Sequence, residues 1–296
     1  MVLLSEAEKI YTIHGVEDDL RTDGRRSADY RPIVLETGVL SQTSGSAHVR
    51  IGTTDVLVGV KVELERIPPD QSSPSLSEGR LEFFVDCSAN AAPDFEGKGG
   101  EEMANEIRSA LAGAYADPNA LPWDSLSFPD KQMGFWVLYV DIVLLEIGGG
   151  LYDAVSLGVK AALFSTQLPR ITVIPSESDL PPDFEISDDI HDCWRLDVSQ
   201  APVLTTVHKI GSGYAVDASL EEEECSLSAL VLGITPEGLV SFSRQSGRGS
   251  LDPDSVTAML KLGSETGHKV HQLLMTKLRE EESIPGRRVM GFLAYT

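Results

Sequence analysis

The sequence predicts an α/β (α+β) fold made of two domains, and three observations support this prediction. A strand, a glycine break, a helix and a second strand follow one another between residues 136 and 174, and this order is typical of α/β proteins. Residues 175–189 hold three prolines and many Ser, Asp and Glu residues, which is typical of a domain boundary. Strands followed by a helix are expected on both sides of it.

Residues 1–30 are expected to form a helix and a turn. Ser5 and Glu8 have the spacing of a capping box, in which each side chain accepts a hydrogen bond from the other residue's backbone N–H group. Gly15 is expected to end this helix or to begin unwinding it. Residues 21–26 predict a turn, because they contain an Asp-Gly pair.

Residues 31–175 are expected to form the first domain. Apolar residues alternate with polar ones on both sides of residues 52–54, which predicts a hairpin. Apolar spacings of three and four residues between Gly99 and Tyr115 predict one face of a helix. Further elements are expected as follows: strands at 81–85, 136–145 and 171–174, a helix at 151–164, and a loop rich in Pro and Ser at 68–77.

A linker over 176–194 and a second domain over 195–296 complete the predicted organisation. Two hairpins are expected, one pairing 203–207 with 214–216 and the other pairing 229–235 with 239–243. Asp252 followed by Pro253 predicts the start of the last helix, since Asp caps helices well and Pro suits the first helical position.

The composition excludes several classes of protein. The chain has 296 residues, 42% hydrophobic and 24% charged, as expected of a folded globular protein. Its 24 Lys and Arg against 46 Asp and Glu give a net charge of −22, which disfavours tight autonomous binding of nucleic acids. Three cysteines are too few and too scattered for a disulfide framework or a zinc site. No signal peptide or membrane span is expected, so we expect a reduced, intracellular chain without a membrane partner.

Two clusters could carry chemistry, but each also has a plain structural interpretation. Gly148-Gly149-Gly150 lies where phosphate-binding loops occur, yet Asp153 stands at the third position of a dinucleotide fingerprint, so tight packing of strand and helix is favoured. The four glutamates at 221–224 could hold a divalent metal beside Asp217. Consecutive side chains cannot all face one ion, so a solvated acidic turn is favoured. The six histidines form no metal-binding pair of the HExxH kind.

Several segments resemble, in their order and spacing, the RNase PH family over about residues 5–292. They are Asp-Gly-Arg at 23–25, Gly-Ser-Ala-His-Val-Arg-Ile-Gly at 45–52, Glu-Phe-Phe-Val-Asp-Cys-Ser at 82–88, and the block 136–164, with Asp217 and its glutamates further on. Within this family the chain is most similar to the non-catalytic subunit type of the exosome ring. The resemblance implies two ribosomal-protein-S5-like βαβ domains and a six-membered ring of paired subunits around a channel for single-stranded RNA.

Active relatives shorten RNA from its 3′ end with phosphate as the attacking group. That chemistry needs groups that hold phosphate and carboxylates near the scissile linkage. The relatives' Gly-Gly-Thr-Arg phosphate loop matches Gly148-Gly149-Gly150-Leu151 here, so the hydroxyl and the guanidinium are both missing. An aliphatic side chain at Leu151 offers neither a hydrogen-bond donor nor a charge.

The acidic and basic positions of active relatives also differ in this chain. Two aspartates of active relatives match Glu223 and Ala229, so that one carboxylate is kept in altered form beside Asp217 and the other is lost. Two arginines along the helix at 99–115 match Asn105 and Ser109. The family pattern is therefore present with its chemistry removed.

The resemblance thus implies a structural exosome subunit that supports 3′-to-5′ RNA processing and decay, rRNA processing included, without being an enzyme or holding a cofactor or metal. Expected partners are a second RNase PH-like subunit in a heterodimer within a hexameric ring, S1/KH-type cap subunits, an associated 3′-to-5′ exonuclease and single-stranded RNA. Lys98 and Arg108 are the candidate RNA contacts. Nucleus, nucleolus and cytoplasm are the expected locations. A phosphorolytic 3′-exoribonuclease is the alternative, and a Rossmann-type cofactor enzyme is a third interpretation that depends on the glycine run alone.

Overall fold

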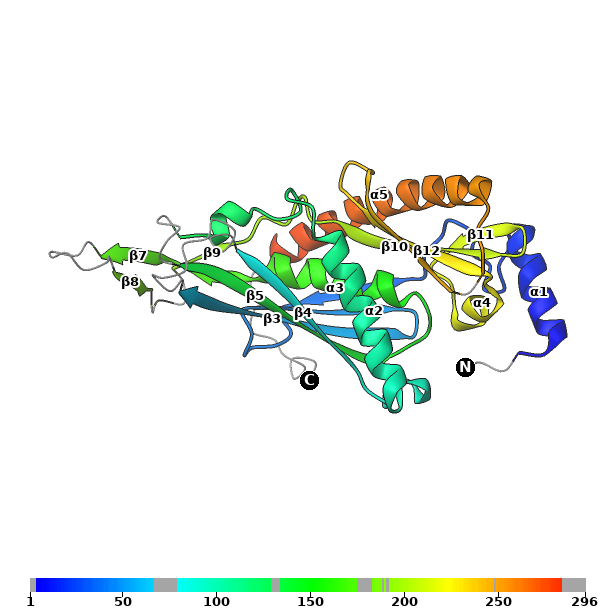
Figure 1. Ribbon diagram of the computed structural model, residues 1–296, viewed down its shortest axis with the longest axis horizontal. Helices are drawn as coiled ribbons and strands as arrows, with labels where there is room; N and C mark the ends of the chain where they lie inside the picture. Colours follow the sequence, from blue (N-terminus) through cyan, green and yellow to red (C-terminus); the bar gives the residue numbers. More distant parts are fainter. Residues whose placement is uncertain are drawn as a thin grey trace.

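The computed structural model describes residues 4–66, 79–128, 134–174, 183–187, 189, 192–247 and 249–283. The loop predicted at 68–77, most of the predicted linker and the chain beyond 283 lie outside these residues. The molecule is elongated, with helix α1 (Glu6–Glu17) at one end and the hairpin of β7 (Ile171–Ile174) and β8 (Asp183–Ile186) at the other (Figure 1). No helix within the described ranges is long and apolar enough to cross a bilayer.

The first sheet has five strands in the order β1-β2-β3-β5-β4, and its strands are β1 (Ile33–Thr37), β2 (Gly45–Ile51), β3 (Thr54–Arg66), β4 (Arg80–Cys87) and β5 (Gly134–Glu146). All neighbours are antiparallel except β4 and β5. The predicted hairpin is confirmed, since Ile51 pairs with Thr54 and Val49 with Val56 across the β2–β3 turn. The predicted strands at 81–85 and 136–145 are confirmed as β4 and β5.

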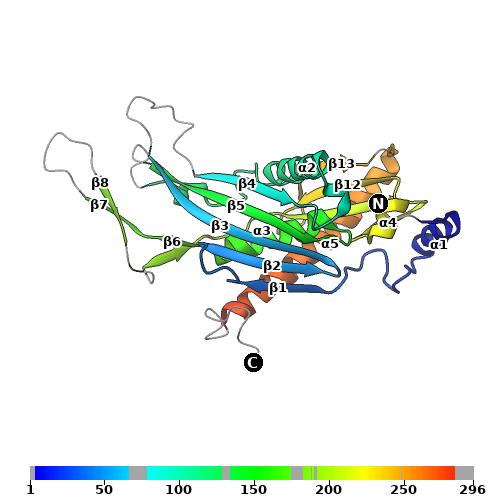
Figure 2. The same cartoon turned by 90° about the horizontal axis from the view of Figure 1, so that it is seen from below.

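Two helices cover one face of this sheet. Helix α2 (Lys98–Ala114) lies along β4, and α3 (Leu151–Ser165) lies across β2 and β3. The apolar stripe predicted between residues 99 and 115 is the buried face of α2, where Ile107 and Leu111 are fully enclosed. Figure 2 shows the opposite face of the sheet in front of α3, with α2 beside the edge strand β4.

The second sheet has four antiparallel strands in the order β11-β10-β12-β13, and its strands are β10 (Val203–Ile210), β11 (Gly213–Val216), β12 (Ser228–Ile234) and β13 (Val240–Ser246). Both hairpins predicted for this half are confirmed. Helix α5 (Pro253–Ser283) covers one side of the sheet (Figure 1), and its start is capped by Asp252, which accepts the Ser255 N–H at 3.1 Å.

Helix α3 is shared between the two sheets, because it packs against β2 and β3 of the first and β10 of the second. One hydrophobic cluster therefore runs through both halves of the molecule. Strands β6 (Gln167–Pro169) and β9 (Cys193–Arg195) form a small separate ladder. The boundary between the two predicted domains stays a prediction.

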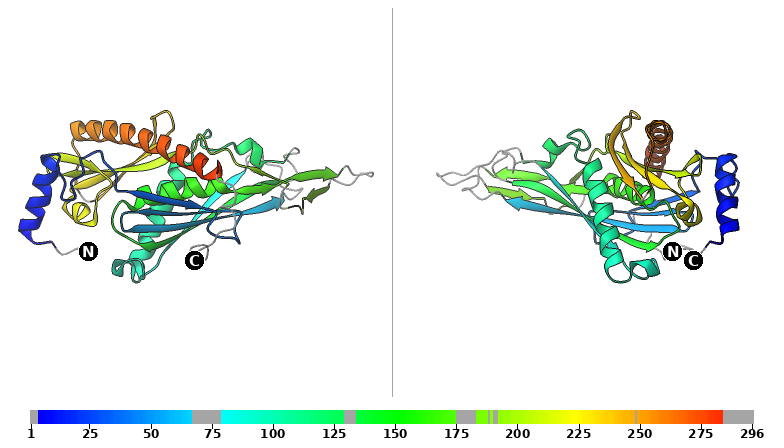
Figure 3. Two further views of the ribbon diagram at one scale, coloured as in Figure 1. Left: turned by 180° about the vertical axis from the view of Figure 1, so that it is seen from behind. Right: turned by 45° about the vertical axis from the view of Figure 1, so that its right-hand side comes forward.

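The expectation that Gly15 ends the first helix is wrong. The capping box of Ser5 and Glu8 is present, but α1 continues to Glu17. The chain reverses after α1 and brings the carbonyl oxygen of Leu20 close to Gly15. A Cβ atom at position 15 would lie only 2.9 Å from that oxygen, so glycine is needed there. Helix α1 stands beside β11 and the short helix α4 (Leu220–Cys225), at the edge of the second sheet (Figure 3).

Candidate functional site

The glycine run connects β5 to α3 and packs against residues 217–219. Gly149 and Gly150 have φ angles of +90° and +65°, a region that favours glycine. A Cβ atom on Gly150 would lie 2.6 Å from Asp217 Oδ1, and one on Gly149 would overlap the carbonyl oxygen of Ala218. The packing interpretation of this run is therefore borne out. Asp153 does not face a nucleotide site, since its oxygens accept the Tyr30 hydroxyl at 2.6 Å and the Thr206 N–H at 2.8 Å.

Side chains of this protein already occupy the polar groups of the loop. The Gly148 N–H donates to Thr54 Oγ1 at 3.0 Å, and the Gly150 N–H donates to Glu223 Oε1 at 2.9 Å. Arg31 donates to the carbonyl oxygens of Gly148 and Gly149 at 2.6 and 2.8 Å. Glu223 thus places a carboxylate at the N-terminus of α3, where the partial positive charge of a helix attracts anions.

Asp217 lies fully buried beside the same loop and pairs with two arginines. Arg31 Nη2 lies 2.6 Å from Oδ1, and Arg25 Nη1 lies 3.1 Å from Oδ2. The backbone N–H of Arg31 also donates to Oδ2 at 2.7 Å. Asp217 has a positive φ of 45°, so this bonding holds a sparsely populated backbone conformation in place.

A second buried pair joins Arg21 to Glu222. Arg21 Nε donates to Glu222 Oε1 at 2.7 Å, Nη2 contacts the other carboxylate oxygen, and further bonds reach the carbonyl oxygens of Val216 and Asp217. Glu222 is only 1% exposed, and it also accepts the Ser219 N–H as part of a capping box that begins α4. The expectation of a solvated acidic turn is wrong for this residue, because the sequence did not reveal its partner in the N-terminal segment.

Burial shifts the pKa values of Glu223 and of its neighbour His208. Loss of hydration raises the pKa of Glu223 to about 7, although the Gly150 N–H and Arg31 oppose this shift. His208 on β10 lies with its Nε2 atom 4.0 Å from Glu223 Oε1, and burial lowers its pKa to about 4. Its ring nitrogens have no hydrogen-bond partner among the described residues. A neutral imidazole here supplies no positive charge to an anion near pH 7.

The predicted site residues fall into two groups. The glycine run, Leu151, Asp217 and Glu223 come together at the start of α3. Ala229 lies on β12 opposite His208 in the strand register and presents only a methyl group. Lys98 and Arg108 are exposed on α2, and Arg108 donates to Asn105 Oδ1 at 2.7 Å.

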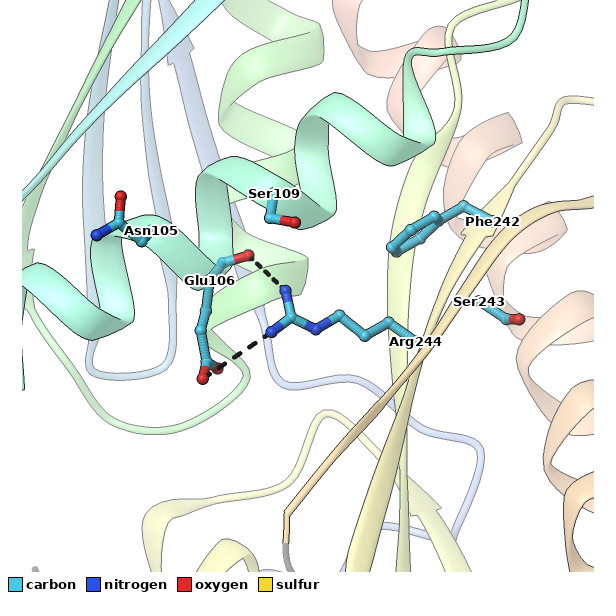
Figure 4. Close-up of a pocket in the computed structure, with 6 residues that line it drawn as sticks. All are labelled: Asn105, Glu106, Ser109, Phe242, Ser243 and Arg244. Carbon is cyan, nitrogen blue, oxygen red and sulfur yellow. Dashed lines mark hydrogen bonds and ion pairs between the residues drawn. The ribbon is translucent and has the colours of Figure 1, made fainter.

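A cleft of about 380 Å³ separates α2 from β13 (Figure 4), and it is lined by Asn105, Glu106, Ser109, Phe242, Ser243 and Arg244. Arg244 reaches across it, donating to the Glu106 carbonyl oxygen at 3.2 Å and lying 3.9 Å from its carboxylate. Tyr152 donates to the other oxygen of that carboxylate at 3.2 Å, which links the cleft to the start of α3. Asn105 and Ser109, the positions expected from the sequence to replace arginines of active relatives, line this cleft without a charge.

Sequence patterns did not reveal a role for the buried Arg21 or for the largely buried Arg25 and Arg31, nor for His208 and Arg244. One signal was available: residues 21–31 hold four arginines, in a chain whose carboxylates outnumber its basic residues about two to one. No group of three or more His, Cys, Asp or Glu in the described part of the chain is arranged to hold a metal ion.

Comparisons with known proteins give one family for both halves of the chain. Residues 29–169 match domain 1 of the RNase PH (3′ exoribonuclease) family, and residues 200–266 match its domain 2. An exosome RRP42 protein of Dictyostelium discoideum, whose name includes the word exonuclease, is 30% identical over 95% of this chain and 99% of its own. The "Exosome complex component Rrp42" of Methanocella arvoryzae is 28% identical over 92% and 97%.

Solved structures agree with this assignment. A structure described as the Archaeoglobus fulgidus exosome with RNA bound to the active site matches with a TM-score of 0.75 and 25% identity, over 90% of this chain and 98% of the matched one. A chain of an archaeal exosome core matches with a TM-score of 0.72 and 23% identity, over 91% and 97%, and supports the fold alone.

Proposed function

The chain belongs to the RNase PH (3′ exoribonuclease) family, and from this premise we propose that it is a structural subunit of the exosome ring that does not itself cleave RNA. Its relatives are named as exosome components, and the similarity covers nearly the whole of both chains. A ring subunit contributes interfaces and part of the RNA path, while another protein supplies the chemistry.

The occupied loop is the observation that carries the non-catalytic role. Phosphorolysis requires that phosphate be held near the RNA, and a loop at a helix N-terminus could do this only with free donors. Here Glu223 takes the Gly150 N–H, Thr54 takes the Gly148 N–H, and the side chain of Leu151 adds no donor. A phosphate ion would also have to displace the Glu223 side chain from the Gly150 N–H.

The nearby cations are engaged as well. Arg25 and Arg31 are held by Asp217, and Arg21 is held by Glu222. Moving Arg21 toward phosphate would leave the buried Glu222 without its partner, which costs on the order of 3–5 kcal/mol. Two N–H groups of the loop and the three nearby arginines are therefore already engaged within this chain, which disfavours phosphorolysis here.

The partners follow from the same proposal. We expect a second RNase PH-like subunit as the neighbour in a hexameric ring, S1/KH-type cap subunits on the ring, an associated 3′-to-5′ exonuclease, and single-stranded RNA in the channel. Lys98 and Arg108 are exposed and are our candidates for contact with that RNA. Nucleus, nucleolus and cytoplasm are the proposed locations.

An activity assay tests the non-catalytic role directly. The purified chain is incubated with a 3′-tailed RNA, Mg²⁺ and phosphate, and we expect no release of nucleoside diphosphates. Leu151→Arg is expected to stay inactive, because Glu223 still occupies the Gly150 N–H. Release by the wild type that Glu223→Ala abolishes would instead establish the phosphorolytic exoribonuclease, as would phosphate bound at the glycine loop in soaked crystals.

A second experiment tests the ring. Size-exclusion chromatography compares the chain alone with the chain co-expressed with an RNase PH-like partner. We expect poor behaviour alone and a stable complex with the partner, because binding stabilises the folded state by mass action. A well-behaved monomer that ignores such partners would contradict the proposal.

A further inference from the structure

We propose that a groove between the α2–β5 connection and the β12–β13 turn docks a basic, partly apolar segment of another protein. The groove has a volume of about 760 Å³, and its walls come from three stretches of chain, at 117–124, 197–200 and 235–239. None of its lining residues belongs to the glycine loop or to the α2–β13 cleft. This proposal is therefore independent of the non-catalytic role.

Backbone hydrogen bonds shape the walls in advance. On one side, the Trp123 N–H donates to the Leu121 carbonyl oxygen and the Ser125 N–H to the Pro122 carbonyl oxygen, both at 2.9 Å. On the other side, bonds of 2.9 Å between Thr235 and both Gly238 and Leu239 close the β12–β13 turn. A preformed groove loses little conformational entropy when a ligand enters it, so more of the contact energy appears as affinity.

Apolar side chains line part of the groove and are open to solvent. Leu239 is 62% exposed, and Val240, which follows it at the start of β13, is 39% exposed. Trp123 and Pro122 are partly exposed, while Leu121 anchors the wall and is only 3% exposed. Large apolar side chains gathered at a concave surface are typical of a site for a partner, and β13 is an edge strand of its sheet.

The charge of the groove selects the partner. Its polar lining includes four carboxylates, Asp117, Asp124, Asp197 and Glu237, and no Lys, Arg or His side chain. Asp117 and Asp197 each accept a backbone N–H at 2.9 Å, from Asn119 and Ser199, which fixes their side chains at the surface. Low-dielectric walls of one charge focus the field, so the groove attracts lysines and arginines and repels phosphates. This combination fits a basic peptide with apolar anchors and disfavours RNA.

Binding of a designed probe tests the groove. The probe is a fluorescein-labelled peptide of alternating lysine and leucine, and its anisotropy is measured with the full chain. Asp197→Lys with Glu237→Lys is expected to weaken binding at least tenfold, on the order expected when two attractive contacts become repulsive. Leu239→Ser is expected to weaken it about threefold through lost apolar contact.

Matched controls separate the groove from general acidity. Glu101→Lys with Glu102→Lys changes the net charge by the same amount at exposed positions of α2, and we expect unchanged binding. Equal weakening by this control would overturn the proposal, as would equal binding of a peptide in which serine replaces leucine. No binding to the wild type at about 1 mM chain, or displacement of the probe by single-stranded RNA, would also overturn it. Melting curves confirm that every variant is folded.

Discussion

The β5–α3 loop and the α2–β13 cleft are neighbours joined by the bond from Tyr152 to Glu106, yet they use charge in opposite ways. At the loop, Arg21 and Asp217 are buried and Arg25 and Arg31 nearly so, and each arginine bonds a carboxylate of this chain. Along α2, Lys98 and Arg108 point to solvent, and Arg244 holds Glu106 only loosely. In the first region, buried ion pairs hold segments of the fold together. In the second, the charged side chains are exposed to solvent.

This difference shows that a count of charges does not locate function. Arginines near the loop could suggest a phosphate site, but their hydrogen bonds bind the N-terminal segment to the second sheet. Charge that is paired inside the fold stabilises one conformation, whereas exposed charge remains available to partners. Four predictions test this contrast, beginning with the largest expected effect.

Breaking the buried pair at Arg21 should cost the most. Arg21→Met leaves Glu222 buried without its cation, so we expect the free energy of unfolding to fall by about 3–5 kcal/mol in urea titrations. Arg26→Met, at an exposed neighbouring position, should change it by less than about 0.5 kcal/mol. Adding Glu222→Gln to Arg21→Met should recover part of the loss. Equal losses of unfolding free energy in the two single variants would show that the buried pair of Arg21 does not stabilise the fold.

Substituting Gly149 in the glycine loop should cause the second-largest loss of stability among the substitutions. Gly149→Ala puts a Cβ atom against the backbone of Ala218 at a φ of +90°, and we expect a loss of about 2–4 kcal/mol. The control is Gly24→Ala, where φ is +83° but no atom lies within 4 Å of the added Cβ, so about 1 kcal/mol is expected. If both variants lost the same amount, backbone conformation alone, without close packing, would explain the glycine run.

The buried carboxyl of Asp153 should make stability depend on pH. Burial raises its pKa to about 7 from an ordinary 3.8, although hydrogen bonds from Tyr30 and Thr206 oppose this. The folded protein therefore binds this proton more tightly than the unfolded chain, and the stability from this group is lost as pH rises through about 7. Relative to Asp153→Asn, the wild type should lose about 4 kcal/mol between about pH 4 and pH 8. Parallel stability curves would contradict the assignment.

Substitutions at the exposed basic residues of α2 should have the smallest effect on stability. They should instead weaken the binding of RNA. Lys98→Ala with Arg108→Ala should leave the free energy of unfolding within about 0.5 kcal/mol, since both side chains are exposed. In an assembled ring, RNA affinity should fall several-fold, and the slope of log K against log salt should decrease by about 1 to 2. The matched variant Lys277→Ala with Arg279→Ala, exposed on α5, should do neither. Equal RNA binding by both variants would remove Lys98 and Arg108 from the RNA path.

Local patterns predicted most of the secondary structure correctly, because each depends on neighbouring residues. The capping box at Ser5, the hairpin around residues 52–54, and the helix that starts at Pro253 all follow from such short-range rules. The short strand β1 was missed, since its apolar run of Ile33, Val34 and Leu35 is too brief to show a period. Gly15 was misjudged because its contact with Leu20 arises only where the chain folds back.

The sequence alone determined the family pattern and the α/β architecture, since these depend on the identity and order of residues. The tertiary structure decided that Glu223 fills the glycine loop, that Glu222 is buried against Arg21, and that four carboxylates line one groove. Those contacts join residues up to two hundred positions apart. Their energies depend on burial and distance, which a linear sequence does not contain.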